Sequence, residues 1–205
     1  FLVPMVDPDG VDLVTGGIAQ GSIQWEQAKR LSNNCPSIPF PNGWKANLLG
    51  VDLNLQYPAG WLQAREIKFS QGYTRPGPRD YVGKAPLTQR ESRALADFTS
   101  YLDPALILAY HTQGEQIYWK YDDIDVPGAL ALGQEFARLS GYSLEKTPYA
   151  SGFAGYKDWF IKVWRRPGFT IEAGLGENPL PISQFDTIYA KNLGILTTAA
   201  LGLPA

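Results

Sequence analysis

The sequence predicts an α/β protein, a three-layer sandwich built on a mixed, largely parallel sheet. Short apolar segments with the length and composition of strands alternate with longer segments whose apolar residues recur at helical spacing. Hydrophobic residues make up 44% of the 205 residues, which is enough to bury one sizeable core. We therefore expect a single domain over residues 1–205.

The expected strands are short apolar runs that end in turn residues or in a polar side chain: 1–6, 49–54, 106–111, 142–146 and 168–174. The expected helices are apolar-periodic segments with helix-ending signals: 25–31, 88–102, 127–141, 154–163 and 181–201. Two local signals are specific. Asp7-Pro8-Asp9-Gly10 is typical of a turn, and Thr88 with Glu91 has the spacing of a capping box that would start a helix.

Charge and composition exclude several partner classes. The net charge is −2, and the charged residues are scattered, so no basic surface is expected to attract nucleic acid. No apolar run approaches the roughly 18 residues of a membrane span. Cys35 is the only cysteine, so it cannot form an internal disulfide and indicates neither an oxidising nor a reducing compartment.

Polar side chains stand at the ends of three expected strands: Asn54, His111 and Glu172. In an open α/β sheet the carboxyl ends of strands face one crevice, so these side chains are expected to converge. An imidazole and a carboxylate in a cleft suit metal-assisted hydrolysis, in which the carboxylate moves a proton from water to the leaving amine. The alternatives are that His111 is an ordinary core histidine and that Glu172 is a solvated strand end.

Several stretches together resemble the zinc metallocarboxypeptidase family, and more narrowly its γ-D-glutamyl-L-diamino acid endopeptidase branch, which cuts peptidoglycan stem peptides. Each stretch alone is a weak motif, but their order and spacing are specific. The matching stretches, besides the His111 strand, are 4–11 (PMVDPDGV), 44–47 (WKAN), 50–54 (GVDLN), 149–152 (YASG), 170–172 (TIE) and 176–181 (GENPLP).

The resemblance implies a role for five residues. His111 would be the last of three zinc ligands, and Glu172 would activate water and shuttle the proton. Tyr149 resembles a mobile tyrosine that closes over bound substrate, within an alignment that can slip by one residue. Lys45 falls where the family often has an arginine that polarises the scissile carbonyl, and Asn54 matches an asparagine that holds the substrate's terminal carboxylate.

One departure narrows the expected substrate. Leu55 stands where ordinary carboxypeptidases place an arginine for the terminal carboxylate. This argues against simple removal of a C-terminal amino acid and favours cleavage of cell-wall peptides. Arg75 or Arg79 is our hypothesis for the missing positive charge, with surface solvation of both as the alternative.

The family's zinc needs three protein ligands, and the resemblance places two of them in a His-x-x-Glu motif upstream of the segment that here begins at Asp7. This sequence has one histidine. We therefore expect an N-terminally incomplete domain that lacks the first strands of its sheet and binds one zinc ion only with ligands from an upstream segment. The expected partner is a peptide or muropeptide, and a cell-wall-associated or secreted location is favoured. The alternatives are an ordinary metallocarboxypeptidase and a non-catalytic module that binds cell-wall peptides.

Overall fold

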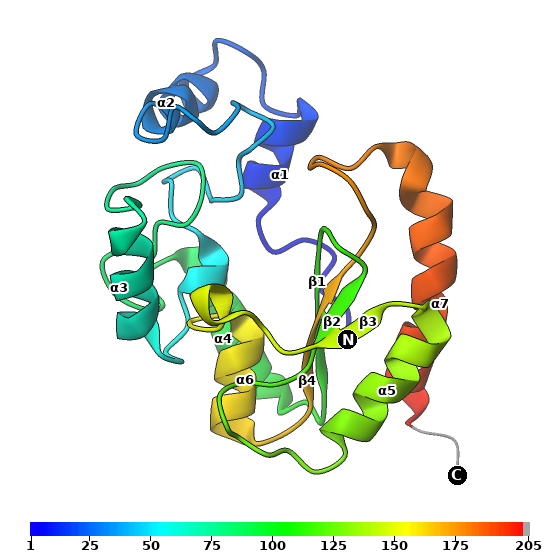
Figure 1. Ribbon diagram of the computed structural model, residues 1–205. Helices are drawn as coiled ribbons and strands as arrows, with labels where there is room; N and C mark the ends of the chain where they lie inside the picture. The colour runs from blue at the N-terminus through cyan, green and yellow to red at the C-terminus, as the bar shows by residue number, and fades with distance from the viewer. Residues whose placement is uncertain (203–205) are drawn as a thin grey trace. The chain divides into compact units, whose positions relative to one another are not determined.

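The computed structural model describes residues 1–202 and divides into two compact units (Figure 1). The first, the helical unit, comprises Phe1–Asp103 and Phe153–Tyr156. The second, the sheet unit, comprises Pro104–Gly152 and the chain from Lys157 onward. Each unit buries apolar clusters of its own. The single domain expected from the sequence stays a prediction.

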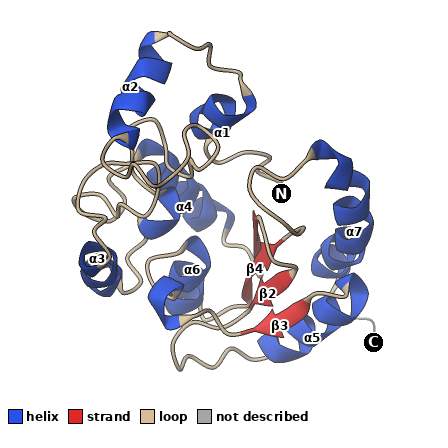
Figure 2. Ribbon diagram, turned by 45° about the horizontal axis from the view of Figure 1, so that its top comes forward, coloured by secondary structure: helices blue, strands red, loops and turns tan. Residues whose placement is uncertain are grey.

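The sheet unit contains a four-stranded sheet in the order β1-β4-β2-β3. Figure 2 shows the strands in red. Its strands are β1 (Ile107–His111), β2 (Gln116–Tyr118), β3 (Ser143–Glu145) and β4 (Gly168–Glu172). β1 pairs with β4 and β2 with β3 in parallel, whereas β2 runs antiparallel to β4. The mixed, largely parallel sheet predicted from the sequence is therefore confirmed.

Helices cover both faces of this sheet. On one face, Phe169 of β4 is fully buried in a cluster with residues of α5 (Ala129–Ser140) and α7 (Phe185–Leu201). Neighbouring residues of a strand point to opposite faces, and a Cβ added at Gly168 would lie 3.3 Å from side chains of α6 (Tyr156–Trp164). Within this unit the sheet thus lies between two helical layers, as the sequence predicted.

The helical unit is built from α-helices and one short 3-10 helix. Its elements are α1 (Pro8–Thr15), α2 (Ile23–Ser32), η1 (Leu53–Leu55), α3 (Trp61–Ser70) and α4 (Arg90–Leu102). None of the helices within residues 1–202 has the length and apolar character needed to cross a membrane. The helices expected over 25–31 and 88–102 are present, whereas α1 and α3 were not predicted. The turn expected over 7–10 is instead the start of α1.

Two expected strands are wrong, and the reasons lie in side-chain hydrogen bonds. Over 49–54, the Asn47 and Asp52 side chains accept bonds from the local backbone, and Asp52 also accepts from the Asp80 N–H. These bonds replace a strand ladder and favour the 3-10 turn η1. Residues 1–6 are irregular and largely exposed, and the chain then enters α1 at Pro8 because Asp7 caps that helix.

The Asp7 carboxylate gives a pH prediction. Burial raises its pKa to about 6 from an ordinary 3.8, and the carboxylates of Glu91, Asp9 and Asp52 act in the same direction against the bond from the Gly10 N–H. Because the folded chain holds this proton more tightly than the unfolded chain, the free energy of unfolding should fall as pH rises from about 4 to about 6. The urea concentration at the unfolding midpoint should fall over this pH range in the natural chain and should fall less in Asp7→Asn. An unchanged slope in the variant would assign the effect to other groups.

The capping box expected at Thr88 is also wrong. The Thr88 hydroxyl and N–H both donate to Oε1 of Gln56, and α4 begins at Arg90 without a side-chain cap. Gln56 is fully buried, and its Nε2 donates to the carbonyls of Val82 and Ala85. One glutamine thus joins the turn after η1 to the segment that precedes α4.

Replacing Gln56 with leucine should lower the free energy of unfolding by about 2–3 kcal/mol. Leucine is similar in size to glutamine but cannot form hydrogen bonds. Several buried backbone groups would then have no hydrogen-bond partner, and each such group destabilises the fold because water does not reach it. Urea unfolding would measure it. Leu62→Gln, on the exposed surface of α3, is the control and should leave the midpoint near that of the natural chain.

Candidate functional site

His111 and Glu172 are the last residues of two neighbouring parallel strands. β1 and β4 pair so that the Cα atoms of His111 and Glu172 are register partners, and the Ala173 N–H donates to the His111 carbonyl at 2.8 Å. Register partners in adjacent strands project to the same face of a sheet. The sheet therefore brings together the imidazole and the carboxylate that the sequence singled out, which lie 61 positions apart in the sequence as numbered.

The same row of the sheet continues into β2. Gln116 is the antiparallel partner of Glu172, and the Tyr118 hydroxyl donates to Oε1 of Gln116 at 2.6 Å. Burial and the nearby carboxylates of Glu172 and Glu145 raise the pKa of Tyr118. Sequence reasoning missed both β2 residues, because a three-residue strand leaves too short an alternation to detect.

Tyr149 also belongs to the sheet unit. It begins η2, a 3-10 turn over Tyr149–Ser151, and its side chain is 69% exposed. An exposed tyrosine on a short turn is compatible with the mobile residue that the sequence suggested. Its role stays a prediction.

The other predicted site residues lie in the helical unit. Lys45 is exposed, and its backbone N–H donates to the Pro78 carbonyl. Asn54 is also exposed, and its Oδ1 accepts from the Tyr156 N–H at 3.1 Å. That bond fixes the carboxamide with its amide nitrogen turned away from Tyr156, so the nitrogen is the atom that could donate to a ligand.

The two candidate arginines differ in their partners. Arg79 donates through Nε to Asp80 at 2.7 Å, and Lys68 pairs with the same carboxylate at 2.6 Å. Burial opposes ionisation of Asp80, but Lys68 and Arg79 outweigh it and lower the pKa. Arg79 is therefore largely neutralised within the fold, whereas no ion pair to Arg75 occurs among residues 1–202.

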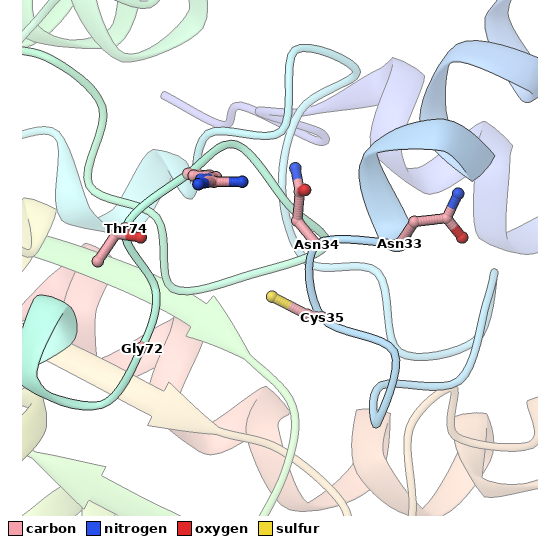
Figure 3. Close-up of a pocket in the computed structure, with 6 residues that line it drawn as sticks. Asn33, Asn34, Cys35, Gly72 and Thr74 are labelled. Carbon is pink, nitrogen blue, oxygen red and sulfur yellow. The ribbon is translucent and has the colours of Figure 1, made fainter.

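Arg75 lines a cavity of about 320 Å³ within the helical unit. Asn33, Asn34 and Cys35 line it from the turn that follows α2, and Gly72 and Thr74 from the turn that follows α3 (Figure 3). Asn34 holds the two turns together by donating to the Pro76 carbonyl at 2.7 Å. Of the two arginines, Arg75 is thus the one that remains available to a carboxylate.

The described residues do not by themselves fit a catalytic zinc ion. Within residues 1–202 no group of three or more His, Cys, Asp or Glu side chains is arranged to hold a metal, and the sequence has one histidine. A catalytic zinc takes three protein ligands and one open position. His111 can supply one of them.

The sequence and the fold were compared with known proteins. A family model described as zinc carboxypeptidase matches residues 1–193. The chain is 50% identical over 194 residues to gamma-D-glutamyl-L-diamino acid endopeptidase 1 of Lysinibacillus sphaericus, covering 95% of this chain and 47% of that protein. It is 41% identical over 198 residues to the uncharacterized protein YqgT of Bacillus subtilis, covering 97% and 51%. The chain thus spans about half the length of the curated relatives it matches.

Solved structures share the fold at low sequence identity. Carboxypeptidase A from Helicoverpa armigera matches with a TM-score of 0.62 and 17% identity, covering 97% of this chain and 50% of that one. Bovine thrombin-activatable fibrinolysis inhibitor matches with a TM-score of 0.56 and 16% identity, covering 74% and 56%. These likenesses agree with the α/β sheet described above.

Proposed function

Because the chain belongs to the zinc carboxypeptidase family, we propose that it is part of a peptidase that hydrolyses γ-D-glutamyl-diamino acid bonds in peptidoglycan stem peptides. The observation that carries this proposal is the register of His111 and Glu172 at the ends of β1 and β4. The chain is 50% identical over 194 residues to an endopeptidase that is named for that bond.

Each of the two residues has a distinct task in this proposal. Glu172 accepts a proton from the attacking water and returns it to the amine that leaves when the amide bond breaks. His111 would hold a zinc ion through an imidazole nitrogen. Because residues 1–202 contain no cluster of three metal-ligating side chains, a zinc ion on His111 would need further ligands.

The helical unit offers groups of its own for a peptide substrate. Asn54 presents its amide nitrogen, Lys45 is an exposed point charge, and Arg75 supplies a charge for a carboxylate. Leu55 is 8% exposed and packs with Trp61 in a buried cluster, so this position offers no charge to a C-terminal carboxylate. That supports the endopeptidase reading over an ordinary carboxypeptidase.

The experiment is cleavage of a defined tripeptide, L-alanyl-γ-D-glutamyl-diaminopimelate, by the protein expressed from its complete reading frame, followed by mass spectrometry with and without added Zn²⁺. We expect release of the diamino acid in a zinc-dependent reaction, and no release of C-terminal residues from ordinary L-peptides. Release from L-peptides alone would favour the conventional carboxypeptidase instead.

A second candidate is a module that binds cell-wall peptides without cleaving them. It is favoured by the donor set, because residues 1–202 supply no cluster of three metal-ligating side chains. This candidate predicts muropeptide binding that neither a chelator nor Glu172→Gln changes, together with no turnover. Zinc-dependent cleavage in the tripeptide experiment would exclude it.

A further inference from the structure

The geometry points to Asn178 as a positioning residue for His111, one that fixes the loop following β1. Its Nδ2 donates to the carbonyl oxygen of Thr112 at 3.2 Å, and Thr112 is the next residue after His111. The inference rests on the proposed function for the task of His111, whereas the contact itself is a property of the fold.

The loop that carries Asn178 follows β4, the strand that ends at Glu172. It starts two residues after Glu172, where the Gly114 N–H donates to the Gly174 carbonyl at 2.8 Å. The Gln184 side chain forms hydrogen bonds with both backbone groups of Leu175. It accepts from the N–H at 3.2 Å and donates to the carbonyl at 2.7 Å. Asn178 therefore projects from an anchored loop, and its side chain ties the segment after Glu172 to the segment after His111.

The orientation of the Asn178 carboxamide is determined by this bond, because only the amide nitrogen can donate to a carbonyl. The other atom, Oδ1, is buried and has no hydrogen-bond partner among residues 1–202. A buried acceptor without a donor destabilises a fold. An asparagine that served stability alone would be a poor choice here, so we assign its role to the single bond it makes next to His111.

The chain offers a matched control. Asn192 in α7 belongs to the same unit, its Nδ2 donates to the Ile188 carbonyl at 2.8 Å and to the Tyr142 hydroxyl at 2.9 Å, and its Oδ1 also lacks a partner among residues 1–202. Asn192→Asp makes the same chemical change as Asn178→Asp. In Asn192→Asp the changed group lies next to Tyr142 and the backbone of α7, and not beside His111.

The test uses the single histidine as its own reporter. Because the sequence has one histidine, the imidazole resonances of the 205-residue chain need no assignment, and they can be compared at one fixed pH. In Asn178→Asp an oxygen replaces the donor and faces the Thr112 carbonyl, so we expect the imidazole resonances to shift. In Asn192→Asp they should stay as in the natural chain.

When the protein cleaves the tripeptide, steady-state kinetics give a second measurement. Asn178→Asp should lower kcat on the order of tenfold to a hundredfold while KM changes little, because small misplacements of catalytic groups are costly to the reaction step. Asn192→Asp should leave kcat near that of the natural enzyme at a temperature where both variants are folded.

Imidazole resonances that move no more in Asn178→Asp than in Asn192→Asp would overturn the inference. If Asn178→Asp does not fold, Asn178→Ala removes the same donor without adding a charge, and its resonances decide the question in the same way. If the natural chain cleaves no γ-D-glutamyl bond, the proposed function fails, while the resonances still show whether Asn178 positions His111.

Discussion

Replacing Glu172 with glutamine should lower kcat for the γ-D-glutamyl substrate by about 10²–10⁴-fold with the fold intact. Glutamine has the same shape but cannot accept the proton of the attacking water, and a positioned general base contributes about that factor. The side chain sits at the end of β4 opposite His111, so its loss leaves the buried side chains of β4 unchanged. Initial rates at saturating tripeptide, with urea midpoints for both proteins, would measure the effect.

The matched control is Glu145→Gln. Glu145 is an exposed carboxylate at the end of β3, and its Cα partner is Tyr118. It lies in the same sheet but outside the His111–Glu172 pair, so its loss should leave kcat within about threefold of the natural enzyme. Equal rates for the natural enzyme and Glu172→Gln would remove Glu172 from the proton-transfer step.

The strands that carry the site could be predicted because their signals are local. β1 and β4 are short, mostly apolar runs with β-branched or aromatic residues, and they end in His111 and Glu172. The parallel pairing of the two strands could be expected from the alternation of strands with helices. Their register, which makes His111 and Glu172 direct partners, becomes visible only in the structure.

The errors arise where long-range hydrogen bonds decide local structure. Residues 49–54 have the apolar pattern of a strand, but Asp52 bonds to the Asp80 N–H, 28 positions away, and the segment turns. Thr88 has the spacing of a cap, but its hydroxyl and N–H both donate to the side chain of Gln56, 32 positions away. A local pattern contains no information about such partners.

The same limit applies to the choice between Arg75 and Arg79. The sequence offers two similar arginines within one irregular segment and no reason to separate them. The fold separates them, because Arg79 pairs with the buried Asp80–Lys68 ion pair, whereas Arg75 lines a cavity. The assignment of Arg75 to a substrate carboxylate is therefore a proposal that depends on tertiary structure.

Replacing Lys157 with methionine should destabilise the sheet unit by about 3–5 kcal/mol. Its Nζ pairs with the Asp158 carboxylate at 2.6 Å and donates to the Lys120 carbonyl at 2.7 Å, and both charged side chains are only 4% exposed. Removing the cation breaks a buried ion pair, which is far more costly than removing a surface charge. Urea unfolding of the natural chain and the variant would measure the difference.

The free energy of the pair itself follows from a second substitution. In the double variant Lys157→Met with Asp158→Asn the buried charge is gone as well, so most of the lost stability should return, because paired buried charges gain little over neutral groups of similar size. Arg138→Met, which breaks the exposed pair with Glu135, should leave the midpoint unchanged. If the double variant is as unstable as Lys157→Met alone, the loss comes from the packing of the lysine stem and not from the lost ion pair with Asp158.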